Sequence, residues 1–366
     1  MRRTMKTKVF ALLSFIVVLS MVFTGCAPAA APAPAADAPA AAPAEVDCTA
    51  ADSFCVGLVT DVGKVDDKSF NQSAYEGLKR AETELGATVK YIETTDSKDY
   101  GKNIATFAEN GYKVIITVGF ALGEATIEAA KQYPDVKFIG VDQSQMDVID
   151  NLSGVIFDED KSGYLAGVLA GLMTKSNKVG GVFATDTVPP VWRFGEGYRA
   201  GVASVNPDAE INIVYHNDVG LDKTFTDPEW GKTTANSMID KGVDVIFSAG
   251  GKTGNGGLIA VAGRSTADAK LYAIGVDADQ YYSVPEAQKV LLSSAMKDIT
   301  PAVFDNIKAI KDGSFKGGNF VGPVFLAPFH DLEADVSADI KAKLEEASKG
   351  LKDGTIKTNV APTKPG

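Results

Sequence analysis

The sequence predicts an α/β protein built from two similar halves, each with a parallel sheet and crossover helices. From Phe54 onward, short strand-like runs alternate with segments of helical spacing, which is the pattern of strand–helix–strand units. Two landmarks also recur in the same order. A strand-like run ending in glycine occurs at 114–120 (VIITVGF) and 245–251 (VIFSAGG), and a run ending in Gly-Val-Asp occurs at 138–142 and 273–277. These echoes indicate paired halves of similar topology.

The first half is expected to begin with a buried strand over FCVGLVT (54–60). A helix over 69–85 follows, because apolar residues recur near helical spacing and Gly86 supplies a stop; these residues are Phe70, Ala74, Leu78, Ala81 and Leu85. Further strands are expected at 88–94, 114–119 and 137–142, with helices around 99–110 and 123–132.

The second half repeats this alternation. Strands are expected at 178–185, 210–216, 243–250 and 271–277, with helices from about 191, over 228–241 and after the third strand. In open α/β sheets, ligands bind beyond the carboxyl ends of the strands. Two such edges facing each other would form a cleft between domains, which is a favoured place for a small-molecule site.

Composition limits the possible functions. The chain has 366 residues, which is most naturally two domains, and its net charge of −11 argues against nucleic-acid binding. Its 18 Phe and 11 Tyr exclude global disorder, and two His with three Cys leave little material for a His/Cys metal centre.

The first 50 residues have the features of a targeting segment and tether rather than of a folded domain. Four positive charges in residues 1–8 precede the 15-residue apolar run Val9–Phe23, which is too short to span a bilayer. The run ends in Thr24-Gly25-Cys26, which resembles a bacterial lipoprotein signal. We expect residues 1–25 to be removed and Cys26 to be lipidated; an ordinary secreted protein is the alternative. Residues 26–50, rich in Ala and Pro, are expected to form an extended tether.

Two cysteines remain if Cys26 is lipidated. Cys48 and Cys55 readily form a disulfide in an exported protein, and two free thiols are the alternative.

The turn TDVGKVDDKSF (60–70) invites a catalytic reading because Asp61, Asp66 and Asp67 lie close together in sequence. Nucleoside hydrolases hold calcium with a similar strand end, but here Val59 occupies the first position of that pattern. Capping of the following helix by Asp67 or Ser69, together with ligand hydrogen bonding, is the preferred interpretation.

The segment AGGKTGNGG (249–257) superficially resembles a phosphate-binding loop. Such a loop needs a glycine at the position of Ile246, so the spacing fails and a glycine-rich turn with accessible N–H groups is left. No G-x-S-x-G motif is present, and nothing forms a convincing nucleophile–base set. We therefore expect a protein that is not an enzyme and needs no cofactor.

With TDVGKVDDKSFNQSAYEGL, the chain resembles the basic membrane protein family, whose members are substrate-binding lipoproteins of ABC importers. Further matching segments are GVDQS (140–144), FDEDKSGYLAGVLAGLMTKSNKVGGV (157–182), RFGEGYRAG (193–201), the run 227–251, AIGVDADQ (273–280) and SSAMKDI (293–299). The resemblance implies a type I periplasmic-binding-protein fold with two lobes, three crossovers and a ligand cleft. The expected N-terminal lobe is 51–156 plus about 278–320; the expected C-terminal lobe is 157–277 plus about 321–358.

The resemblance also implies which residues would hold the base of a nucleoside. Phe70 and Phe194 would sandwich the base, since base–aromatic stacking contributes roughly 1–3 kcal/mol per ring. Asp61 and Asn71 would lie beside the base, and Asp142 on the same lobe. Without the resemblance, core packing would be the ordinary interpretation of both rings.

On the sugar side, the resemblance implies that Gly251 lines the glycine turn and that Asp277 and Lys297 bind the ribose hydroxyls. A helix cap and a solvated lysine are the ordinary alternatives for these two residues. Relatives usually read Ala-Gly-Gly-Thr/Ser-Gly where this chain has AGGKTG (249–254), so Lys252 stands as an insertion. We expect its side chain to point to solvent, with contact to a ligand oxygen as the alternative.

Together these observations predict a lipid-anchored, extracytoplasmic, monomeric protein that binds nucleosides, with purines favoured, and delivers them to an ABC permease. It would touch the membrane only through its anchor and would bind no nucleic acid and no metal. The alternatives are the same fold binding a sugar or other small polar ligand, and a secreted nucleoside hydrolase.

Overall fold

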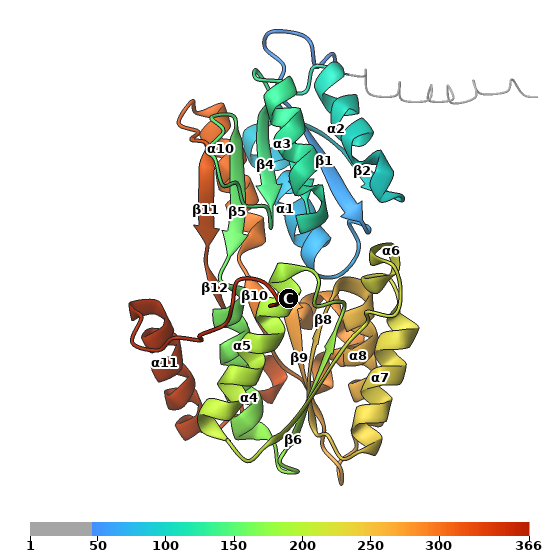
Figure 1. The fold of residues 1–366 in the computed structure, drawn as a ribbon, viewed down its shortest axis with the longest axis vertical. Coiled ribbons are helices and arrows are strands. Elements are labelled where there is room, and N and C mark those ends of the chain that lie inside the picture. The colour runs from blue at the N-terminus through green and yellow to red at the C-terminus, as the bar shows by residue number, and fades with distance from the viewer. Residues whose placement is uncertain (1–45, 366) are drawn as a thin grey trace, which may run out of the picture. The chain divides into compact units, whose positions relative to one another are not determined.

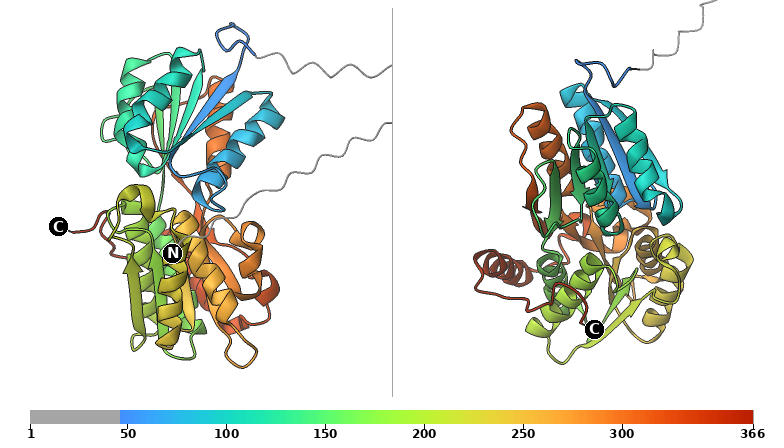
Figure 2. Two further views of the ribbon diagram at one scale, coloured as in Figure 1. Left: turned by 90° about the vertical axis from the view of Figure 1, so that its right-hand side faces the viewer. Right: turned by 45° about the horizontal axis from the view of Figure 1, so that its top comes forward.

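The computed structural model describes residues 46–365, which form two lobes, each a parallel-dominated sheet covered by helices (Figures 1 and 2). The predicted α/β class and two-lobe fold are confirmed. The signal peptide, Cys26 and most of the expected tether lie outside the described residues. Within residues 46–365, no helix combines the length and apolar character that a membrane span requires.

The N-terminal lobe contains a sheet in the order β11-β5-β4-β3-β1-β2, in which every neighbouring pair is parallel. Its strands are β1 (Cys55–Val62), β2 (Thr88–Thr94), β3 (Val114–Val118), β4 (Lys137–Val141), β5 (Leu152–Phe157) and β11 (Gly318–Gly322). Helices α1 (Phe70–Leu85) and α10 (Ile299–Lys311) pack on one face, and α2 (Tyr100–Glu109) and α3 (Gly123–Gln132) on the other. Coverage of both faces explains why β3 is buried along its whole length.

The C-terminal lobe repeats this order as β12-β10-β9-β8-β6-β7, except that β12 is antiparallel to its neighbour. Its strands are β6 (Lys178–Phe183), β7 (Glu210–Tyr215), β8 (Val245–Ala249), β9 (Tyr272–Asp277), β10 (Leu291–Lys297) and β12 (Val324–Leu326). One face carries α4 (Glu159–Met173), α5 (Pro189–Val205) and α11 (Ala338–Asp353), and the other carries α7 (Pro228–Asp240) and α8 (Gly251–Arg264). The short helices α6 (Leu221–Thr224) and α9 (Gln280–Ser283) lie in connections.

The pair α4 and α5 is packed through glycines. A Cβ atom on Gly167 would lie 2.1 Å from the carbonyl oxygen of Tyr198, and one on Gly201 would lie 2.0 Å from that of Tyr164. Only glycine allows the two backbones to approach this closely. These contacts hold α5 closely against α4.

The chain crosses between the lobes three times, near residues 158, 298 and 323. The expected boundary is wrong in one respect: residues 278–297 belong to the C-terminal lobe, not to the N-terminal one. Strand β10 pairs with β9 and β12, so its buried side chains pack within the C-terminal lobe. The N-terminal lobe receives only residues 298–322 from this part of the chain.

The amino end of the described chain is fixed to the N-terminal lobe by a disulfide bond and by packing. Cys48 and Cys55 form a disulfide, and Cys48 is buried in the same core cluster as residues of α2. The expected tether therefore stops before residue 50, because the residues around Cys48 pack against the lobe. A Cβ atom on Gly111 would lie 2.9 Å from the carbonyl carbon of Cys48.

Candidate functional site

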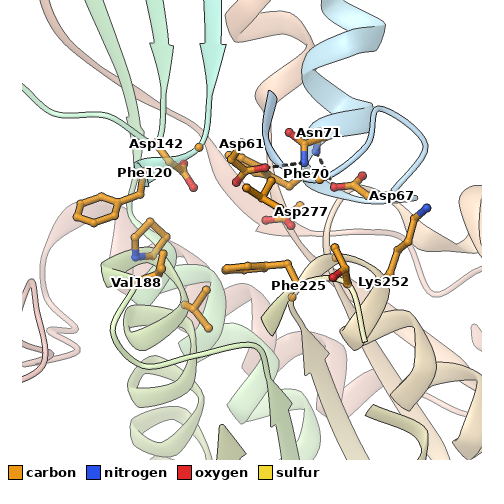
Figure 3. A pocket seen from close by; sticks show the side chains of 18 of the residues that line it. Asp61, Asp67, Phe70, Asn71, Phe120, Asp142, Val188, Phe225, Lys252 and Asp277 are labelled. Atoms are coloured by element: carbon orange, nitrogen blue, oxygen red, sulfur yellow. Dashed lines mark hydrogen bonds between the residues drawn. The ribbon is translucent and has the colours of Figure 1, made fainter. Parts of the chain in front are cut away.

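A cavity of about 400 Å³ lies between the lobes, where the carboxyl ends of both sheets meet. Figure 3 shows its walls, with residues from the N-terminal lobe above and residues from the C-terminal lobe below. All eight ligand-binding residues predicted from the sequence lie in its lining: Asp61, Phe70, Asn71, Asp142, Phe194, Gly251, Asp277 and Lys297.

An amide–carboxyl pair marks the N-terminal side of the cavity. Asn71, in the first turn of α1, donates from Nδ2 to Oδ1 of Asp61 at 3.1 Å, as drawn in Figure 3. Burial raises the pKa of Asp61 to about 7, against the lowering effect of that hydrogen bond and with small additions from Asp67 and Asp142. Oδ1 of Asn71 is buried and accepts no hydrogen bond from any described residue. The pair thus presents unused hydrogen-bonding capacity to the cavity.

Asp67 holds this pair in position. Its carboxylate accepts from the backbone N–H groups of Ser69 and Asn71 at 2.9 Å and of Gln72 at 3.1 Å. These are the donors that a helix N-terminus leaves without partners, so Asp67 caps α1. The sequence left Asp67 or Ser69 as the cap, and the side chain of Ser69 instead crosses to the other lobe. It donates to Oδ2 of Asp277 at 2.7 Å.

Two aspartates from pseudo-equivalent strand ends converge on one lysine. Asp142 follows β4 and Asp277 ends β9, both with left-handed backbones (φ 60° and 63°). Nζ of Lys297 lies 2.5 Å from Oδ2 of Asp142 and 3.6 Å from Oδ1 of Asp277. Burial opposes the charge on this ammonium, but the surrounding carboxylates outweigh it and raise the pKa of Lys297.

The same lysine is connected, through Glu159 and Arg193, to the first crossover between the lobes. Nζ of Lys297 lies 3.8 Å from Oε1 of Glu159, and Oε2 of Glu159 lies 3.1 Å from Nη1 of Arg193. Arg193 also donates to the carbonyl oxygen of Phe157 at 3.0 Å, next to the first crossover. Burial raises the pKa of Glu159 to about 8 despite these cations. Sequence reasoning missed Glu159, whose place at a helix start gave no signal beyond ordinary capping.

The aromatic side chains are arranged differently from the expectation. Phe70 is partly exposed in the cavity, whereas Phe194 is only 2% exposed and packs edge-on against Phe247. The ammonium of Lys297 lies 4.6 Å from the Phe70 ring centroid and 5.7 Å from that of Phe194. The ammonium group therefore lies within cation–π distance of both rings.

A further ring, Phe225, was not predicted. It comes from the connection between β7 and α7, is partly exposed, and lies below Phe70 in Figure 3. The available signal was a single Phe in the polar segment 216–227, directly after the carboxyl end of a predicted strand.

The glycine turn after β8 supports that ring. Gly250 and Gly251 have φ of 139° and 53°, and a Cβ atom on Gly251 would lie 3.1 Å from the carbonyl oxygen of Phe225. The next residue, Lys252, places Nζ 3.0 Å from Oδ1 of Asp66 on the opposite lobe. Lys252 thus forms an ion pair across the cleft rather than extending freely into solvent, although its side chain also lines the cavity.

Two lobes, three crossovers and a lined interlobe cavity define a solute-binding protein of the periplasmic-binding class. An ABC transporter solute-binding protein from Aeropyrum pernix superposes with a TM-score of 0.75 at 27% identity, covering 83% of this chain and 92% of that one.

The chain belongs to the PnrA-like (Bmp) family of ABC transporter substrate-binding proteins, whose family model matches residues 54–322. It is 37% identical over 331 residues to a CD4+ T-cell-stimulating antigen of Listeria monocytogenes, covering 85% of this chain and 89% of that protein. It is 34% identical to the ABC transporter nucleoside-binding protein BmpA of Lactococcus lactis, covering 82% and 87%. An uncharacterized lipoprotein of Pyrococcus abyssi is 31% identical over 74% of this chain and 67% of that protein. The resemblance drawn from the sequence is confirmed.

Proposed function

We propose that this substrate-binding protein takes up nucleosides, with purines favoured, in the interlobe cavity and delivers them to its ABC permease. The observation that carries the proposal is a cavity with aromatic faces and two different polar pairs in its lining. One is the amide–carboxyl pair of Asn71 and Asp61, and the other is the carboxylate–ammonium pair of Asp277 and Lys297. The family membership and the name of the Lactococcus relative support the same ligand class.

The base would lie between Phe70 and Phe225 rather than between Phe70 and Phe194. Phe70 and Phe225 come from opposite lobes and are both partly exposed in the cavity, so closure of the lobes can bring them onto the two faces of one flat ring. Phe194 is a core residue whose remaining exposure is too small to offer a face. It supports the floor of the site through Phe247.

The base edge would meet Asp61 and Asn71. A carboxylate accepts from ring or exocyclic N–H groups, while the unused Oδ1 of Asn71 accepts a further N–H. The ribose hydroxyls would meet Asp277 and Lys297, an acceptor and a donor. A nucleoside base offers a flat ring face to Phe70 and Phe225 together with N–H donors for Asp61 and Asn71, a combination that a sugar alone does not provide.

The protein would work as a monomer at the extracytoplasmic face of the cell membrane, anchored through a lipid on Cys26. The leader sequence supports the anchor, as does the lipoprotein among the relatives. Cys26→Ser should move the protein from the membrane to the soluble fraction of its bacterial host. A wild-type protein that is itself soluble and retains residues 1–25 would contradict the anchor.

Titration with inosine tests the ligand class and separates it from its rivals. The expected result is saturable heat with no release of free base, measured by calorimetry and by chromatography of the mixture. Free base would instead show a hydrolase, and binding of sugars without binding of any nucleoside would show the other alternative. Phe225→Ala should weaken the binding of all accepted nucleosides by about 1–3 kcal/mol, the contribution of one stacked ring.

A further inference from the structure

A second cavity adjoins the first at the end where Asp61 lies. It has a volume of about 340 Å³ and shares Asp61, Val62, Phe120, Val188 and Phe225 with the main cavity. Figure 3 shows Phe120 and Val188 on the side of Asp61 away from Lys252. The two cavities therefore adjoin along these shared residues, among them Asp61.

The walls of this second compartment combine apolar and polar groups and come from both lobes. Val62, Tyr100 and Phe120 come from the N-terminal lobe, and Val188, Leu221 and Phe225 from the C-terminal lobe. Phe120 is 45% exposed and Leu221 is 43% exposed, although both are large apolar side chains. Exposed apolar groups that line one hollow from opposite sides are the surface that an apolar ligand group would cover.

Tyr100 adds a fixed wall. Its ring is buried in the N-terminal core, and its hydroxyl accepts a hydrogen bond from the backbone N–H of Val62 at 3.3 Å. The hydroxyl keeps its own O–H group as a possible donor. Burial, with additions from Asp61 and Asp222, raises the pKa of Tyr100, so this wall carries a polar group as well as a ring. Asp61, Ser97 and Asp222 are the other polar members of the lining, and Asp222 also lines the main cavity.

Asp61 determines which ligand atom points into this space. In the proposed function, on which this inference rests, Asp61 accepts from an N–H group on the base. An exocyclic amino group has two N–H bonds, and replacing one hydrogen by a carbon chain leaves the other to donate to the carboxylate. Because Asp61 lines both cavities, the substituent on that nitrogen would extend into the second compartment.

We propose that the second compartment is a subsite for an apolar substituent on the exocyclic nitrogen of the base. The ligand class of this protein then includes N-alkylated and N-arylated purine nucleosides in addition to the parent nucleosides. The burial of an aromatic substituent against Phe120 and Leu221 offsets the loss of one N–H donor.

The test compares adenosine and guanosine with N6-benzyladenosine and N2-benzylguanosine by calorimetric titration of the full chain. For the parent that binds more tightly, the benzyl derivative is expected to bind with equal or greater affinity. Leu221→Trp fills the compartment from a residue that lines only the second cavity. It should weaken the benzyl derivative more than tenfold and change the parent less than threefold.

Ile259→Trp is the matched control. Ile259 is an exposed apolar residue on α8 that lines neither cavity, so this variant should leave both ligands unchanged. A wild-type protein that binds the parent but loses more than tenfold with the benzyl derivative would overturn the subsite alone. Equal weakening of both ligands by Leu221→Trp would do the same. Failure of every nucleoside to bind would overturn the proposed function, and the subsite with it.

Discussion

The two lobes have the same strand order, yet they contribute different chemistry at one equivalent position. Val141 pairs with Val155 in the N-terminal sheet, and Val276 pairs with Ala295 in the C-terminal sheet. The residues two places further along β5 and β10 are Phe157 and Lys297. The neighbouring strand ends carry Asp142 and Asp277 with the same left-handed backbone.

This difference shows how two lobes of similar topology can contribute different chemical groups to the cavity between them. Two equivalent aspartates alone would place two carboxylates at the lobe boundary with no cation between them. Replacing the phenyl ring of one lobe by an ammonium group gives both aspartates one shared partner, because Lys297 reaches across to Asp142. The ring of Phe157 lies 5.4 Å from that ammonium, so the two equivalent positions also contact each other.

The largest expected effect comes from removing this asymmetry. Lys297→Met leaves Asp142, Asp277 and Glu159 buried without their common cation. Breaking a buried ion pair costs about 3–5 kcal/mol, so we expect a loss of this size in the free energy of unfolding at pH 7. Urea denaturation measures it, and Phe157→Met, at the equivalent position of the other lobe, should cost less than about 1.5 kcal/mol. Equal losses would show that the two positions do not differ in role.

The next effect separates the two lobes by what they recognise. Asp277→Ala removes a sugar-side acceptor and should weaken ribonucleosides about ten- to a hundredfold, while 2′,3′-dideoxynucleosides, which lack the hydroxyls, change little. Asp61→Asn acts on the base side and should weaken both kinds of nucleoside by the same factor. Calorimetric titration of each protein with each ligand gives the comparison. Equal effects of Asp277→Ala on both ligands would mean that this carboxylate does not contact the sugar.

A pH dependence should follow from the buried acid of the N-terminal lobe. The pKa of Asp61 is raised to about 7 in the free protein, and an N–H donor from a base would lower it in the complex. Binding then releases a proton below pH 7, so affinity falls as pH decreases, by up to about tenfold per pH unit, and levels off above pH 7. Titration in buffers of different ionisation enthalpy detects the proton. Asp61→Asn should abolish this component, although Asp67, whose pKa is raised to about 6, also titrates nearby.

The smallest effect concerns the ion pair that joins the lobes at the cleft. Lys252 and Asp66 are both partly exposed, and exposed pairs contribute about 0–1 kcal/mol. Lys252→Met should therefore weaken ligand binding less than about fivefold and make it less sensitive to salt. The control Lys232→Met removes a lysine whose partner Glu229 lies on the same helix, so no change is expected. A hundredfold loss on Lys252→Met would show that this lysine contacts the ligand.

The alternation of strands and helices could be predicted because most elements carry their own periodicity and stop signals. Helix α1 begins at Phe70 and ends before Gly86, whose left-handed backbone (φ 66°) matches the predicted stop. Elements next to the crossovers were harder to assign. Strand β10 is polar in part, and its lobe depends on which sheet it joins rather than on local pattern.

Site residues could be predicted only where they belong to a recognisable sequence motif. The repeated Gly-Val-Asp indicated paired halves, while the resemblance to the family implied Asp61, Asn71, Asp142 and Asp277 as site residues. Phe225 escaped because its role depends on the glycine turn at Gly251, which approaches from a different part of the chain. Phe194 attracted attention as an aromatic in a matching segment, but burial by α4 and β8 cannot be read from spacing.

The disulfide between Cys48 and Cys55 has a consequence for proteolytic release. It closes the amino end of the N-terminal lobe, and Cys48 is packed against Gly111. Every residue that lines either interlobe cavity lies between Asp61 and Lys297. A protease that cuts the Ala/Pro-rich segment before Val46 would therefore shed a fragment that retains both cores, the disulfide-bonded amino end and the complete ligand site. Under the proposed lipid anchor and ligand site, capture of the ligand would in this way be separable from attachment to the cell.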